Sequence, residues 1–141
     1  MESYEWTAIG RMAIEAGAYA AATATFGKAK GDPEALVGLA IAANRTGKDR
    51  GAIERADKAV AQEIGGLEKD IAKDVASKGK ANISDLAELS WNLNLRAALQ
   101  QLVGDTEKAR ATLRDARKRC GAQFDLREMS IAVGLKESDA R

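Results

Sequence analysis

The sequence lacks histidine and has one cysteine, Cys120. Without histidine the chain cannot hold a Ser-His-Asp or Cys-His catalytic set, an imidazole metal ligand or a histidine-based pH switch. A single cysteine excludes a disulfide within the chain and a cysteine-cluster zinc site, and it is typical of a reducing compartment. Phosphate-binding glycine loops and calcium-binding loops are also absent from the sequence. We therefore expect a protein that is not an enzyme and that uses no metal and no cofactor.

Charge of one sign and long apolar runs are also scarce. The 22 Lys and Arg residues against 21 Asp and Glu give a formal net charge of +1, which disfavours nucleic acid as the main partner. The beginning of the chain, residues 1–5, is acidic where a secretory signal would be basic. The longest uncharged run, residues 16–27, is too short to span a bilayer. These features predict a cytoplasmic protein that does not bind a membrane.

The apolar fraction is unusual in its make-up. Hydrophobic residues form 45% of the chain, but only 4% of residues are aromatic and about a fifth are alanine. Alanine is the strongest helix former, and a core of alanine and leucine requires helices to pack closely. The composition therefore predicts a single all-α domain covering residues 1–141.

Apolar residues recur at helical spacing along most of the chain, with no sustained strand-like alternation. We expect Asp32 with Pro33, Asp49 and Ser84 to begin helices, because Asp and Ser cap helix N-termini and Pro suits the first turn. The glycine pair at 65–66 is expected to interrupt a helix. A polar tail, residues 136–141, follows the last helix. The predicted helices cover residues 4–16, 19–30, 33–45, 49–63, 67–77, 85–103, 106–120 and 126–133.

A repeated pattern of large and small residues runs through these helices. The first copy reads Trp6-x2-Ile9-Gly10-x2-Ala13, then Gly17, Tyr19, Ala22-x3-Phe26-x2-Ala29 and Pro33. The pattern resembles the tetratricopeptide repeat, a pair of antiparallel helices. Small residues at Gly10 and Ala22 would let the two helices cross closely, and Trp6, Ile9 and Phe26 would fill the space around the crossing.

Two further copies lack the aromatic residues. They read Leu36-x2-Leu39-Ala40-x2-Ala43, Gly47, Ala52-x3-Ala56-x2-Ala59, and Leu93-x2-Arg96-Ala97-x2-Gln100, Gly104, Ala109-x3-Leu113-x2-Ala116. The resemblance implies two units in residues 4–62, an inserted helix in 63–83, a third unit in 84–120, and a cap with a tail in 121–141. Its units would stack as a short right-handed superhelix. The alternative is an irregular helical bundle whose alanine and glycine spacing mimics the repeat.

The resemblance also implies a function. In such a superhelix the first helix of each unit lines a concave groove that receives an extended peptide or a helix of another protein. The chain would then be a non-catalytic adaptor or a small chaperone-like protein. The set of residues with which some family members grip a C-terminal carboxylate is incomplete here, and Trp91 is expected in either the groove or the core. The groove positions are Tyr4, Thr7, Arg11, Glu34, Val37, Ile41, Asn44, Arg45, Trp91, Asn94, Ala98 and Gln101.

Two alternatives come from other features. The alanine-rich segment 16–24 favours self-association into a homo-oligomer. A basic stripe on the 106–120 helix would suit an acidic partner or the phosphate backbone of a nucleic acid, although cations near a helix C-terminus are also simply solvated and favoured by the helix dipole. The opposite face of this helix is apolar and predicts that Cys120 is a small buried hydrophobe. The stripe contains Arg110, Arg114, Arg117 and Lys118.

Overall fold

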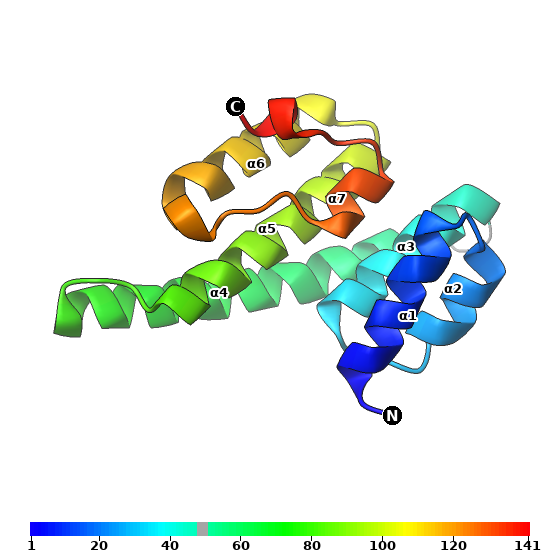
Figure 1. Cartoon of the computed structure of the whole chain (residues 1–141), viewed down its shortest axis with the longest axis horizontal. Helices are drawn as coiled ribbons and strands as arrows, with labels where there is room; N and C mark the ends of the chain where they lie inside the picture. The colour runs from blue at the N-terminus through cyan, green and yellow to red at the C-terminus, as the bar shows by residue number, and fades with distance from the viewer. Residues whose placement is uncertain (48–50) are drawn as a thin grey trace.

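The computed structural model describes residues 1–47 and 51–141, and helices are the only regular structure in these ranges. The prediction of an all-α fold is confirmed. Two short 3-10 helices, η1 (Gly121–Gln123) and η2 (Glu137–Ala140), accompany the α-helices. The α-helices, shown in Figure 1, are α1 (Ser3–Glu15), α2 (Tyr19–Phe26), α3 (Pro33–Thr46), α4 (Ala52–Lys78), α5 (Ile83–Leu102), α6 (Thr106–Cys120) and α7 (Glu128–Ala132).

Each of the helices α1 to α5 packs against the next α-helix along the chain. In addition, α3 packs against both α1 and α5 and so lies between these two helices. The links between α1 and α2 and between α5 and α6 are tight turns. Gly17 and Gly104 supply the left-handed backbone, φ 72° and 88°, that these turns require.

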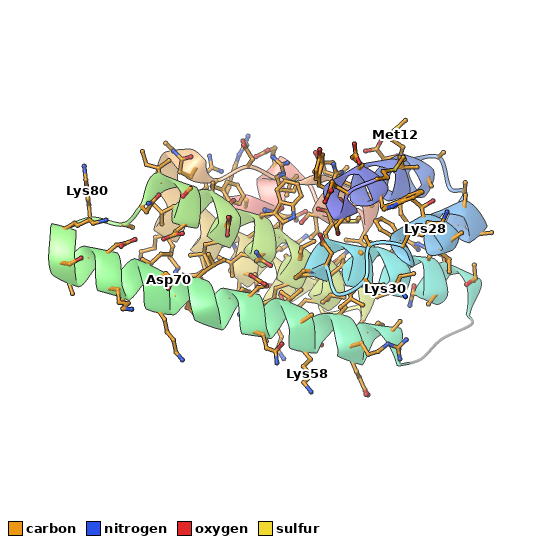
Figure 2. The ribbon with its side chains drawn as sticks, turned by 90° about the horizontal axis from the view of Figure 1, so that it is seen from below. Met12, Lys28, Lys30, Lys58, Asp70 and Lys80 are labelled. Atoms are coloured by element: carbon orange, nitrogen blue, oxygen red, sulfur yellow. The ribbon has the colours of Figure 1, made fainter. Side chains whose placement is uncertain are left out.

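The helix α4 differs from its prediction. It runs without a break from Ala52 to Lys78, through Gly65 and Gly66. A glycine inside a helix costs only about 1 kcal/mol relative to alanine, and the buried Ile64 and Leu67 on either side of the pair keep the helix packed. The segment 63–83 is therefore not an inserted helix. Its helical part continues α4, which extends with the start of α5 beyond the other helices (Figure 1, and along its length in Figure 2).

The observed helix caps agree in part with those predicted from the sequence. Asp32 caps α3, since its carboxylate accepts hydrogen bonds from the backbone N–H groups of Glu34 and Ala35. The cap of α5 is Asn82 and not Ser84, because the Asn82 side chain accepts the N–H of Ser84 and begins the helix at Ile83. The predicted cap Asp49 lies outside the described residues. The helix α2 ends at Phe26, before the predicted Lys30.

The centre of the first three helices is the ring of Phe26, the largest of the fully buried side chains. Gly10 of α1 and Gly38 of α3 contact this ring so closely that a Cβ at either position would overlap it. The close crossing predicted at Gly10 is therefore present, but Ile9, expected to fill it, is 41% exposed. Ala22, predicted at the same crossing, is buried, and so are the alanines at the equivalent positions of the two further copies: Ala40, Ala52, Ala97 and Ala109.

The end of the chain is not a free polar tail. The helix η2 packs on α6, Ala140 is buried, and Arg110 Nε donates a 2.8 Å hydrogen bond to Asp139. The predicted cap, α7, packs on α5 and also contacts α1. It therefore lies on the side of the molecule where α1, α3 and α5 meet, and does not close the last hairpin alone (Figure 1).

We expect Gly38→Ala to lower the free energy of unfolding by about 1–3 kcal/mol, because the added methyl overpacks against Phe26. The control Gly65→Ala adds the same methyl inside α4, where nothing lies within 4 Å. It should raise the free energy of unfolding by up to about 1 kcal/mol through helix propensity. Urea unfolding followed by circular dichroism measures both. Equal effects of the two substitutions would contradict the packing of Phe26 described above.

Candidate functional site

A hollow of about 430 Å³ lies where α1, α3 and α5 meet, and we call it the inner hollow. Five of the predicted groove residues line it together, from three helices. The complete lining is Tyr4, Thr7, Ala8, Arg11, Asp32, Pro33, Glu34, Glu63, Trp91, Asn92 and Leu95. The predicted members are Tyr4, Thr7, Arg11, Glu34 and Trp91.

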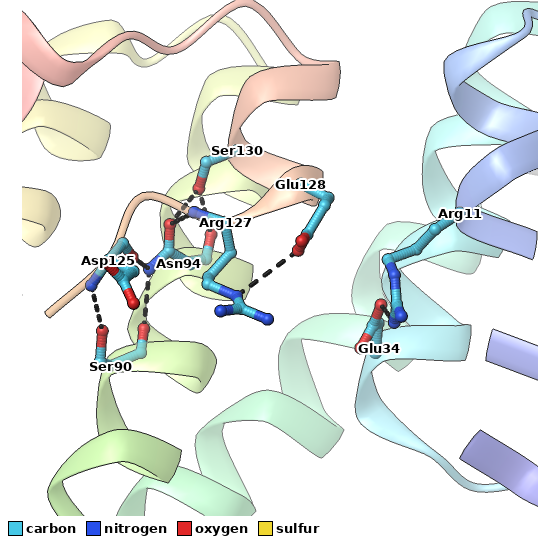
Figure 3. Close-up of polar contacts among 8 residues, drawn as sticks. All are labelled: Arg11, Glu34, Ser90, Asn94, Asp125, Arg127, Glu128 and Ser130. Atoms are coloured by element: carbon cyan, nitrogen blue, oxygen red, sulfur yellow. Dashed lines mark hydrogen bonds and ion pairs between the residues drawn. The ribbon is translucent and has the colours of Figure 1, made fainter. Parts of the chain in front are cut away.

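An ion pair joins two walls of the inner hollow. Arg11 Nη1 donates a 2.5 Å hydrogen bond to Glu34 Oε1, which links α1 to the start of α3 (Figure 3). Glu34 is only 5% exposed, and this burial raises the pKa of its carboxyl although the Arg11 guanidinium opposes the change. A buried carboxylate held by one guanidinium keeps the two helices in a defined register.

Trp91 is half-buried and forms the wall contributed by α5. The guanidinium of Arg127 lies 4.1 Å from its ring centroid, and that of Arg11 lies at 5.7 Å. Both distances suit cation–π attraction. Trp91 therefore both packs against the core and lines the inner hollow, the two positions that the sequence left open.

Asn94, predicted to face a partner, is fully buried and binds a segment of its own chain. Its Nδ2 donates to the carbonyl oxygens of Ser90 and Asp125 at 2.9 and 2.8 Å. Its Oδ1 accepts from the N–H of Arg127 and the hydroxyl of Ser130 at 2.8 and 2.9 Å (Figure 3). All four bonding positions of the amide are used, and three of them hold residues 125–130 against α5.

Several other groove predictions need correction. Val37, Ile41 and Ala98 are at most 1% exposed, because α3 is packed by α1, α2, α4 and α5, and α5 is packed by α3, α4, α6 and α7. These three side chains belong to the core. The predicted positions near helix C-termini, namely Asn44, Arg45 and Gln101, do not line the inner hollow.

The sequence did not predict that residues 125–130, at the start of α7, pack on α5, or that Asn92 is buried. The signal was present in α5, where Ser90, Asn92 and Asn94 alternate with apolar residues and all three are buried. Buried polar side chains need partners, so such a run indicates a further segment packed on this helix. Asn92 Nδ2 donates to the Glu88 carbonyl, but its Oδ1 accepts no hydrogen bond from the described residues.

The basic face of α6 is only partly paired. Arg110 binds Asp139 and Glu107, and this lowers the pKa of the Asp139 carboxyl. The other predicted members of the stripe, Arg114, Arg117 and Lys118, are exposed, and no described carboxylate pairs with them. On the opposite face Cys120 is 3% exposed, as predicted, and burial raises the pKa of its thiol.

Comparison with models of known families, with curated proteins and with solved structures finds no match for this chain. The resemblance to tetratricopeptide repeats therefore stays a prediction. Over residues 1–47 and 51–141, no cluster of His, Cys, Asp and Glu side chains could hold a metal ion. None of the helices in these ranges combines the length and apolar character needed to cross a membrane.

The raised pKa of Glu34 predicts a pH dependence of stability. Between its ordinary pKa of 4.5 and the raised value, the folded protein keeps a proton that the unfolded chain has released. Deprotonation therefore favours the unfolded chain in this window. We expect the free energy of unfolding of the wild type, relative to Glu34→Gln, to fall as pH rises through it and to be constant outside it. Urea unfolding of both proteins across acidic to neutral pH measures this, and a difference that rises with pH would contradict it.

Two buried asparagines on α5 provide a matched test of whether the Asn94 amide holds residues 125–130 against this helix. Asn94→Ala leaves backbone groups of Asp125 and Arg127 without partners and should cost about 2–4 kcal/mol in the free energy of unfolding. Asn92→Ala removes a single bond within its own helix and should cost about 1 kcal/mol or less. Only Asn94→Ala should speed proteolysis between residues 121 and 141. Equal effects would show that the amide network does not hold this segment.

Proposed function

We propose that this chain is a non-catalytic protein-interaction module of the tetratricopeptide-like kind, which binds an extended peptide segment of another protein in the inner hollow. The packing of α1, α3 and α5 supports the arrangement, since these are the first helices of three successive hairpins and α3 packs against both of the others. The single observation that carries the function is the meeting of Tyr4, Thr7, Arg11, Glu34 and Trp91 at one hollow.

The chain's own C-terminal segment supports the mode of binding. Phe124 and Arg127 have extended backbones, with ψ of 129° and 167°, and the segment between them lies on α5. Ser90 and Asn94 bind the backbone groups of Asp125 and Arg127 through their side chains. This face of α5 thus already holds one extended segment by side-chain-to-backbone hydrogen bonds, and the inner hollow continues along the same helix at Trp91, Asn92 and Leu95.

The chemistry of the inner hollow suits a peptide. Tyr4 is 69% exposed and Trp91 presents part of its ring, and these are residue types that dominate binding energy in protein interfaces. Asn92 also lines the hollow, and its buried Oδ1 has no hydrogen-bond partner among the described residues. Glu63 and Asp32 add negative charge beside the Arg11–Glu34 pair. A peptide with an apolar anchor and neighbouring donors therefore fits this lining.

The test uses peptides selected from a display library on the full chain. In a Trp6→Phe background Trp91 is the only tryptophan, so its emission reports occupancy of the inner hollow. We expect selected peptides to shift this emission, and Tyr4→Ala to weaken their affinity by about tenfold, the loss typical of an interface aromatic.

The matched control is Met12→Ala. Met12 lies on the same helix as Tyr4 and is almost equally exposed, 68% against 69%, but it does not line the inner hollow and projects outward (Figure 2). It should leave the affinity unchanged. Equal losses at both positions, or selected peptides that leave Trp91 emission unaltered, would place binding elsewhere.

A further inference from the structure

A second hollow lies on α6, on a surface that takes no part in the function proposed above. Its volume is about 430 Å³, and it is lined by Arg114, Arg117 and Lys118 of α6 together with Ala140 and Arg141. We call it the basic hollow. Four of its five lining residues are cations, and no carboxylate side chain is among them.

Arg141 distinguishes this hollow from an ordinary solvated helix face, because it does not belong to α6. Cations near the C-terminus of a helix are favoured by its dipole, which accounts for those on α6 itself. Arg141 comes from a different segment, which η2 docks on α6 through buried Ala140 and the bond between Arg110 and Asp139. The tertiary structure thus adds a fourth cationic side chain to the three that the helix already carries.

The neighbouring cations are neutralised, and those of the basic hollow are not. Arg110 pairs with Asp139 and Glu107, while Arg119 pairs with Asp115 and Glu68. No described carboxylate pairs with the lining side chains Arg114, Arg117, Lys118 and Arg141. The cationic side chains of this surface that pair with no described carboxylate side chain are therefore concentrated at the hollow.

We propose that the basic hollow binds an acidic, Asp- or Glu-rich segment of a partner protein. Arginine and lysine side chains pair with carboxylates, and spread negative charge suits four cations that stand around an open surface. The floor is apolar at Ala140 and along the side-chain stems, which suits the methylene groups of glutamate.

Phosphate groups fit less well. The hollow lies by the last turns of α6, where backbone carbonyls carry partial negative charge, so a compact phosphate dianion is repelled more strongly than singly charged carboxylates spread along a segment. A nucleic-acid backbone requires an extended cationic track. Here Glu107 pairs with Arg110, and Asp115 and Glu68 pair with Arg119, so the arginines on either side of the hollow do not extend its positive charge. The net charge of the chain is also only +1.

The probe is a short fluorescein-labelled oligoglutamate peptide, titrated with the full chain at low salt and followed by fluorescence anisotropy. We expect saturable binding that weakens as salt is raised, because the contacts are exposed ion pairs. The triple variant Arg114→Gln, Arg117→Gln, Lys118→Gln should lower the affinity by about tenfold. These residues are exposed and unpaired with described carboxylates, so the variant should keep the circular dichroism spectrum of the wild type, with a small fall in the unfolding midpoint from the lost interaction with the helix dipole.

The control triple variant Lys58→Gln, Lys69→Gln, Lys73→Gln changes the net charge equally on the exposed face of α4, where Lys58 projects away from the other helices (Figure 2). It should retain the affinity of the wild type. Equal losses in the two variants, or no saturable binding at low salt, would overturn the proposal. A single-stranded DNA or polyphosphate probe of similar charge that bound more tightly than oligoglutamate would assign the hollow to phosphate ligands instead.

Discussion

The ring of Phe26 is enclosed between α1 and α3, and this packing sets how the first three helices lie relative to one another. Its ring comes from α2 and meets Gly10 of α1 and Gly38 of α3, where a Cβ atom has no room. The contact brings α1 and α3 close together, because no side chain separates either helix from the ring. That approach allows Arg11 to reach Glu34, and the resulting ion pair forms part of the wall of the inner hollow. The shape of the hollow therefore depends on two missing methyl groups.

A second constraint comes from Asn94. An amide buried to this extent is costly unless all its donors and acceptors are used, and residues 125–130 supply three of its four partners. The same bonds place Arg127 against Trp91 and set α7 between α5 and α1. The C-terminal segment thus covers part of the inner side of α5, and the part that it leaves open, at Trp91 and Leu95, lines the inner hollow.

The molecule carries two surfaces of different chemistry. The inner hollow combines aromatic side chains with an internally balanced ion pair, which favours recognition by shape and hydrogen bonding. The basic hollow has charge without internal balance, which favours recognition by electrostatic attraction. They are formed by different helices, α1, α3, α4 and α5 for the first and α6 with the end of the chain for the second. Under the two proposals, one partner could contact both surfaces or two partners could bind separately.

Local pattern was sufficient to predict the all-α fold, the cap at Asp32 and the burial of the crossing alanines such as Ala22 and Ala97, because periodicity and capping act between neighbours in sequence. The groove positions came from the resemblance to tetratricopeptide repeats, and only some of them, Tyr4 and Arg11 among them, line the inner hollow. The prediction that Gly65 and Gly66 interrupt a helix was wrong, because the packing of α4 outweighs the small cost of glycine inside a helix. Tertiary structure alone decided that Ile41 and Asn94 are buried and that Arg141 joins the cations of α6, since each depends on a segment distant in sequence.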